Sequence, residues 1–384
     1  MNRLPGGDIK AGPFLATGKL LQVALEIAKE VNYSLLHNNR ELLSKLTLTK
    51  LVARQVLDIT VQVELNVGTE HYPYRYTLPM MDDVQLALSS QVRIPLTANL
   101  PRSVRERVQS TVYVKVTCEG QTAFEDTRRV TLIPVDEWLD DTATNPWLPS
   151  FVLPRDPAVL AIIKSARRFL VAITDEPAAG FDGYQEQAAG VDKQVKAIWT
   201  ALVHEYRLQY INPPPAYSKQ TQRLRTPTEI IASNTGTCID LALLLASCLE
   251  YIGLYPVIVL RTDHAFAGYW RAEDAHDQLV AVDRIPATVP AVGDRAARAA
   301  ATRYVDPYGW RLTRLNYDEI MDYVESGDLV LLEATYLTGA FSYKGAAKEG
   351  QSKLRDRDEF DSLLDIQLAR TADPPVTPLP LISG

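Results

Sequence analysis

The stretch NTGTCIDLALLLASCLEYIG, residues 234–253, decides how the second half of the chain folds. Leucine, alanine and isoleucine fill most positions after Cys238, which predicts a helix that is buried on most of its sides. Thr237 and Asp240 have the spacing of a capping box, so Thr237 is the expected N-cap and Cys238 the first helical residue. Gly253 supplies the stop signal at the other end.

A cysteine at the start of a helix lies at the positive end of the helix dipole, beside N–H groups that have no partner in the helix. Both features favour thiolate over thiol and can lower a pKa of about 8.5 to roughly 3.5–7.5. The same N–H groups can hold an oxyanion. Cys238 is therefore the candidate nucleophile. Cys248, on the buried side of the helix, and Cys118, within an alternating strand pattern, are expected to fill the core.

A thiolate needs a basic partner, and the chain has five histidines. His264 opens the apolar run HAFAGYW, a position that suits a sheet edge facing the start of a helix. Asp283 closes the run LVAVD and could orient the imidazole from a neighbouring strand. Asp274 and Asp277 are nearer but are expected in a solvated turn. The spacing alone leaves open a structural reading of the cysteine, the histidine and the acid.

Residues 1–140 have the alternating pattern of β-strands and are expected to form a β-sandwich of the immunoglobulin-like kind. The predicted strands lie at 57–65, 91–100, 111–120 and 127–135. Residues 141–150, acidic and proline-containing, are the expected linker.

Residues 151–345 are expected to form a second domain in which helices precede strands. Helices are predicted from Pro157 behind an Asp156 cap, at 191–208, at 226–233 and from Cys238, and strands at 255–262, 264–270, 278–284 and 328–339. This order favours the α+β class over a doubly wound sheet. Residues 291–304 look like an inserted loop or short helix. Residues 346–384 are expected to hold a helix at 358–371 and a proline-rich tail.

Composition excludes several classes of protein. The 384 residues suggest two or three domains, and the net charge of −7 offers no basic face, so no direct binding of nucleic acid is expected. No apolar run approaches the length of about 18 residues that suggests a membrane helix, and no signal peptide is expected. The three cysteines match no disulfide or zinc pattern, so neither metal nor cofactor is expected and a cytoplasmic location fits best.

The run GTCIDLALLLASCLEYIGLYPVIVL, followed by HAFAGYW and LVAVD, resembles the Cys–His–Asp core of the transglutaminase-like, papain-like cysteine peptidase superfamily. In that superfamily the cysteine opens a central helix packed on an antiparallel sheet, whose strands carry the histidine and the acid. Cys238, His264 and Asp283 fall on those three positions. Papain-like enzymes also place an upstream polar side chain in the oxyanion hole, and Gln222 matches it.

The resemblance extends to most of the chain. Segments such as VNYSLLHNN, QRLRTPTEI and LVLLEATYLTG are similar to the N-terminal module of large bacterial helicase-containing proteins, in which a β-sandwich precedes a transglutaminase-like domain and a helicase and nuclease follow. The chain has no P-loop motif GxxxxGK[ST]. The resemblance therefore implies either a stand-alone protein or the front part of a larger one, with a part in phage defence.

The implied activity is thiol acyl transfer, most simply by a cysteine peptidase that acts on a protein partner encoded nearby. Transglutaminase or deamidase chemistry is an alternative, although the sequence shows no cluster of calcium ligands. A further alternative is an inactive scaffold that recruits a helicase or nuclease partner. The sequence predicts neither the protein substrate nor the oligomeric state.

Overall fold

The computed structural model describes residues 14–17, 19–38, 42–94, 100, 104–139, 145–185, 187–212, 221–283 and 308–380. The chain divides into two compact units, of which the first ends at Glu137 and the second begins at Trp138. The structure combines helices with several separate sheets, which is compatible with the α+β class.

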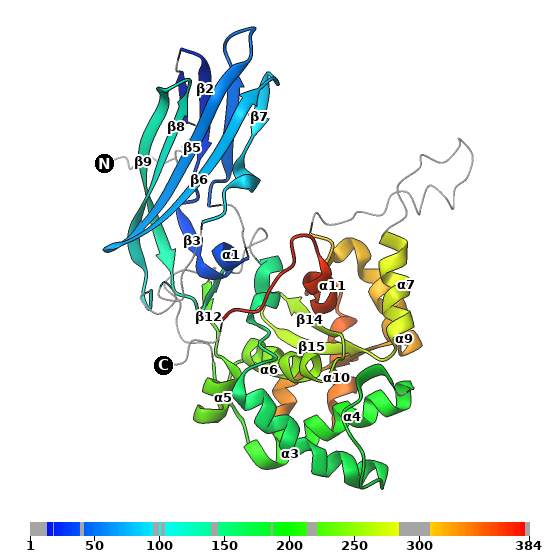
Figure 1. The fold of residues 1–384 in the computed structure, drawn as a ribbon. Helices are drawn as coiled ribbons and strands as arrows, with labels where there is room; N and C mark the ends of the chain where they lie inside the picture. Colours follow the sequence, from blue (N-terminus) through cyan, green and yellow to red (C-terminus); the bar gives the residue numbers. More distant parts are fainter. Residues whose placement is uncertain are drawn as a thin grey trace, which may run out of the picture. The chain divides into compact units, whose positions relative to one another are not determined.

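The first unit is built from two β-sheets (Figure 1). The smaller has the order β1-β2-β4-β7, with β1 (Phe14–Thr17), β2 (Leu21–Glu26), β4 (Lys45–Lys50) and β7 (Gln85–Ala87). The larger has the order β3-β9-β8-β5-β6, with β3 (Glu30–Asn32), β9 (Gln121–Ile133), β8 (Val108–Cys118), β5 (Val56–Val67) and β6 (Glu70–Met81). Helix α1 (Tyr33–His37) and the 3-10 turn η1 (Ser89–Gln91) complete the described elements of this unit.

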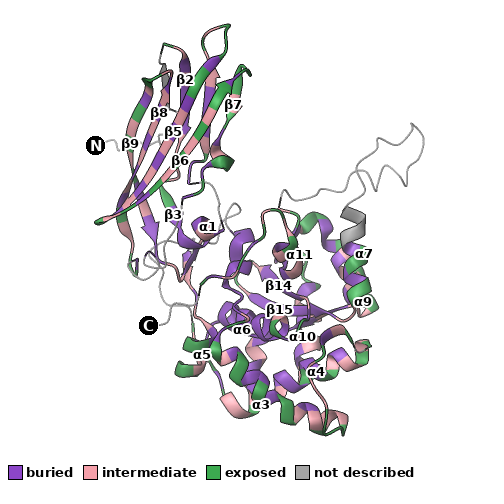
Figure 2. Ribbon diagram, viewed as in Figure 1, coloured by how far each residue is buried: buried purple, intermediate pink, exposed green. Residues whose placement is uncertain are grey.

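The alternation seen in the sequence builds the core of this unit. Along β5, Val61, Val63 and Leu65 are buried, while the residues between them are partly exposed (Figure 2). Strands β1 and β2 of the smaller sheet contact β9 of the larger one. Strands β5 and β8 of the larger sheet therefore bury one face and leave the other partly exposed, as expected of a sheet that packs on one side. The predicted strands at 57–65, 111–120 and 127–135 are confirmed as β5, β8 and β9.

Two strand assignments differ from the sequence analysis. The strand predicted at 91–100 is wrong for residues 92–94, which lie outside any strand, and residues 95–99 lie outside the described residues. Strand β6 was not predicted, since its sequence contains Pro73 and Pro79. Proline is tolerated there because β6 lies at the edge of its sheet and needs hydrogen bonds on one side only.

The second unit places a five-stranded antiparallel sheet among helices. The sheet order is β16-β18-β14-β15-β17, with β16 (Arg311–Thr313), β18 (Phe360–Asp365), β14 (Pro256–Arg261), β15 (Ala265–Trp270) and β17 (Leu329–Leu332). The α-helices are α3 (Pro157–Thr174), α4 (Ala188–Ala201), α5 (Pro227–Ser233), α6 (Cys238–Tyr251), α7 (Glu273–Asp283), α9 (Tyr317–Ser326), α10 (Tyr343–Leu354) and α11 (Ile366–Thr371).

Short elements connect these helices and strands. They are the 3-10 turns η2 (Asn145–Phe151), η3 (Gly183–Gln185), η5 (Arg314–Asn316) and η6 (Ala334–Thr338), the π turn η4 (Leu202–Tyr206), and the short strands β10 (Glu137–Leu139), β11 (Gln209–Tyr210), β12 (Thr221–Arg223) and β13 (Thr235–Gly236).

Helix α6 is the buried centre of the second unit. Its residues from Cys238 to Leu249 are all buried, and it packs against β14 and β15 (Figures 1 and 2). Alternate residues of the same strands, such as Val257 and Phe266, join a cluster with α7 and α9. Since both faces of these strands are covered, their sequences are continuously apolar rather than alternating.

Several predictions for the second half of the chain are corrected by the structure. The strand predicted at 328–339 ends at Leu332, and Ala334–Thr338 form the 3-10 turn η6. The strand predicted at 278–284 is helical as far as Asp283, within α7. The helix predicted at 358–371 is strand β18 followed by α11, because Phe360 and Leu363 are buried where β18 pairs between β16 and β14.

A further correction concerns the domain limits. Residues 145–150, placed in the predicted linker, form the buried turn η2. Strand β18, placed in the predicted C-terminal segment 346–384, lies inside the sheet of the second unit. The predicted insertion at 291–304 lies outside the described residues.

Candidate active site

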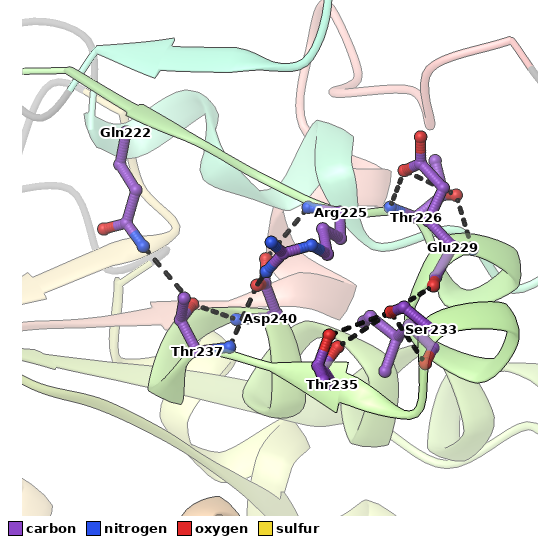
Figure 3. Close-up of polar contacts among 9 residues, drawn as sticks. Gln222, Arg225, Thr226, Glu229, Ser233, Thr235, Thr237 and Asp240 are labelled. Atoms are coloured by element: carbon purple, nitrogen blue, oxygen red, sulfur yellow. Dashed lines mark hydrogen bonds and ion pairs between the residues drawn. The ribbon is translucent and has the colours of Figure 1, made fainter. Parts of the chain in front are cut away.

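The first turn of α6 is built as its sequence predicts. Thr237 is the N-cap, and its hydroxyl accepts a hydrogen bond from the Asp240 N–H at 3.3 Å. The Asp240 carboxylate accepts one in return from the Thr237 N–H at 3.0 Å (Figure 3). This capping box fixes Cys238 as the first helical residue, at the end of the helix where partial positive charge gathers.

The segment before α5 makes hydrogen bonds and an ion pair with the first turn of α6. The Arg225 N–H donates to Asp240 Oδ1 at 2.9 Å, and the Arg225 guanidinium lies 3.2 Å from Oδ2 (Figure 3). Gln222 Nε2 donates to the Thr237 hydroxyl at 3.3 Å. The amide of Gln222 thus contacts Thr237, the residue that precedes Cys238. Its assignment to the oxyanion hole stays a prediction.

The thiol of Cys238 faces the turn between β14 and β15. It makes hydrogen bonds with the His264 side chain and with the backbone N–H groups of Ala265 and Ile239. The turn is closed by a hydrogen bond from the Arg261 N–H to the His264 carbonyl at 2.8 Å. The antiparallel pairing of β14 with β15 therefore presents His264 to the start of α6.

These contacts move the pKa values of the two groups toward an ion pair. Burial alone would raise the pKa of the Cys238 thiol, but the hydrogen bonds from His264 and the two backbone N–H groups outweigh it, and the pKa is lowered. Burial would lower the pKa of His264, whereas its contacts with Cys238 and Glu333 raise it to about 9. A lowered thiol pKa and a raised imidazole pKa both favour thiolate and imidazolium at neutral pH.

The acidic partner of His264 is Glu333, whose side chain is fully buried. Its Oε2 lies 2.8 Å from His264 Nε2 and 2.7 Å from Lys353 Nζ. Its Oε1 accepts from the N–H and the hydroxyl of Thr335 at 3.0 and 2.6 Å. Burial would raise the pKa of this carboxyl, but the contacts with His264, Lys353 and Thr335 lower it to about 2. With Nε2 facing Glu333, Nδ1 is the ring nitrogen left to face the thiol.

The acid predicted from the sequence, Asp283, is not the partner of His264 within the described residues. Asp283 lies in the last turn of α7, not on a strand beside β15, and its side chain lies outside the described residues. Asp274 and Asp277 are exposed on the same helix rather than in a turn.

A signal for Glu333 was present in the sequence. The expected feature, an acid that closes an apolar strand beside the histidine strand, does occur in the run LVLLE. Strand β17 ends at Leu332, and Leu332 pairs with Ala267 of β15. The neighbour of β15 on this side is β17, whereas the run that ends at Asp283 is part of helix α7.

Tyr210 is a residue of this site that the sequence did not reveal. Its side chain hydrogen-bonds with Cys238, and burial together with that contact raises the pKa of the phenol, which keeps it a donor. The parallel pairing of β11 with β13 sets Tyr210 opposite Gly236, two residues before the cysteine. Tyr210 is 43% exposed, so this phenol contacts both the thiol and the solvent.

The three cysteines differ in environment although all are free and buried. Burial raises the pKa of Cys118 in β8 and of Cys248 in the middle of α6. Of the three, the pKa is lowered at Cys238 alone.

Trp270 is buried in the core of the second unit, where its indole N–H donates to Asp365 at 2.8 Å.

Within the described residues, no group of three or more histidine, cysteine and acidic side chains is arranged to hold a metal ion. A search of the same residues finds no helix with the length and apolar character needed to cross a bilayer.

No family model matches the sequence, and no curated protein is significantly similar to it.

Proposed function

We propose that the chain is a thiol acyl-transfer enzyme, a cysteine peptidase that acts on a protein partner. The observation that carries the proposal is the chain of contacts from Cys238 at the start of α6 to His264 and from His264 to the buried Glu333. A nucleophile, a base and an orienting acid in hydrogen-bond sequence are the parts that covalent acyl transfer requires. A central helix that begins with the nucleophile and packs on an antiparallel sheet supports a transglutaminase-like second unit.

In the first half of the reaction the Cys238 thiolate attacks an amide carbonyl carbon and forms a C–S bond. The negative charge that develops on the carbonyl oxygen needs donors, for which N–H groups at the start of α6, the Tyr210 hydroxyl and the Gln222 amide are candidates. His264 then gives the proton on Nδ1 to the leaving amine as the C–N bond breaks, which leaves a thioester on Cys238.

In the second half a nucleophile attacks the thioester while neutral His264 accepts its proton. Water as the nucleophile releases a carboxylic acid and restores the Cys238 thiolate beside protonated His264, whereas a primary amine gives an amide, which is transamidation. Glu333 stays ionised throughout and holds the imidazole by Nε2. The partner protein, and a part in phage defence, rest on the resemblance to helicase-containing bacterial proteins.

The test is to incubate the purified chain, and its Cys238→Ala variant as control, with a bacterial lysate that contains a tagged primary amine. New protein N-termini that need Cys238 are the expected result. Incorporation of the tag without new N-termini would replace the peptidase by a transglutaminase. A Cys238 that reacts with neither proteins nor a peptide aldehyde would favour the inactive scaffold.

A further inference from the structure

Lys353, near the end of α10, lies against the acid of the candidate site. Its Nζ is 2.7 Å from Glu333 Oε2 and 3.1 Å from His264 Nε2. His264 Nε2 is itself 2.8 Å from the same carboxylate oxygen. One oxygen of a fully buried carboxylate therefore faces two basic side chains.

Lys353, the second basic side chain, completes the balance of charges in the site. The other carboxylate oxygen receives only neutral donors, both from Thr335. When the thiol is ionised, the site holds two negative groups, Cys238 and Glu333, and two positive ones, His264 and Lys353. Without Lys353 the imidazolium would face both negative groups alone, in surroundings where an unbalanced charge is costly.

We propose that Lys353 is a positioning residue of this site: its ammonium balances the Glu333 carboxylate, which leaves the His264 imidazolium to balance the Cys238 thiolate. The inference rests on the proposed thiol chemistry and deepens it, since it names the group that sets the pH at which Cys238 and His264 exist as thiolate and imidazolium. Lys353 acts on the thiol through Glu333 and His264, the two side chains that its ammonium contacts.

The other groups around the imidazole are few. Within the described residues, the titratable side chains that contact His264 are Cys238 from α6, Glu333 before η6 and Lys353 from α10. Tyr210 from β11 contacts Cys238. Tyr336 of η6 forms a hydrogen bond with Glu349 of α10. Asp263, next to His264 in the chain, is exposed. Lys353 is therefore the positive group whose removal changes the balance most.

The experiment measures the rate at which iodoacetamide alkylates Cys238 as a function of pH, together with the ¹⁵N resonances of His264, in the full chain. The variants are Lys353→Met, Lys353→Arg and Lys348→Met, the last being an exposed lysine on the same helix. In Lys353→Met, the pH at which the thiolate forms and the pH at which His264 loses its proton should both rise by about one unit or more, because a nearby positive charge is lost. Lys353→Arg and Lys348→Met should keep the wild-type profile.

An unchanged or downward-shifted profile in folded Lys353→Met would overturn the proposal, as would an equal shift in Lys353→Arg. Lys353→Gln replaces the methionine variant if the latter does not melt cooperatively. These readouts need no protein substrate. A Lys353-dependent profile in a chain that transfers no acyl group would leave this inference standing and reject the proposed function.

Discussion

At the scale of single residues, the choice of acid matters most for the chemistry. Glu333→Gln keeps the shape of the side chain but removes the charge that holds His264 by Nε2. Where such an acid is essential, its amide variant loses about 10⁴ in turnover. We expect Glu333→Gln to lose activity on the cleaved partner far more than Asp283→Asn, measured as initial rates on the same substrate. A larger loss of activity in Asp283→Asn than in Glu333→Gln would show that Asp283, the acid predicted from the sequence, is the one that orients His264.

The contact between the candidate nucleophile and the candidate base could be expected from the sequence because both residues carry local signals. Cys238 is marked by the capping box around it and His264 by the apolar strand that it precedes. Glu333 could not be chosen with the same ease, since its position depends on β17 pairing with β15 across a long stretch of chain. Tyr210 likewise reaches the thiol through the pairing of two-residue strands, which leaves no periodic pattern.

At the scale of elements, two helices carry the same type of N-terminal cap and allow a matched comparison. Thr226 caps α5 and Thr237 caps α6, each in a complete capping box. Replacing either by alanine should cost about 1 kcal/mol of stability, measured by urea unfolding. Only Thr237→Ala should also slow the alkylation of Cys238, since only that cap fixes the turn that holds the thiol. Equal reactivity in both variants would show that the cap does not position the cysteine.

The elements differ in how well a sequence can reveal them. Helices α3, α5 and α6 carry cap signals at their starts, and all three begin where those signals predicted. The run DSLLD of strand β18 lacks alternation, and its strand form depends on pairing with β14 and β16 on both sides. The run LVAVD of helix α7 is short and rich in valine, so its local pattern favours a strand.

At the scale of the whole molecule, the division at Glu137 and Trp138 separates the β-sheet unit from every residue of the candidate site. A chain that begins at Trp138 should therefore keep the reactivity of Cys238 toward a small probe and lose action on the protein partner, if the first unit selects that partner. Probe labelling, circular dichroism and partner cleavage are measured on one preparation. Loss of probe labelling together with the native spectrum would show that the units depend on each other to fold.

The most direct test of the central claim compares the alkylation rates of Cys238, Cys118 and Cys248 at pH 6.5 by peptide mass spectrometry. Contacts with His264 and two backbone N–H groups lower the pKa of the Cys238 thiol, whereas burial raises the pKa of Cys118 and Cys248, so Cys238 should react much faster than the two core cysteines. In His264→Ala the labelling of Cys238 should fall toward that of an ordinary thiol, with a pKa of about 8.5, and rise with pH. Equal slow labelling of all three cysteines in the wild-type chain, or labelling of Cys238 that is unchanged without His264, would contradict the account.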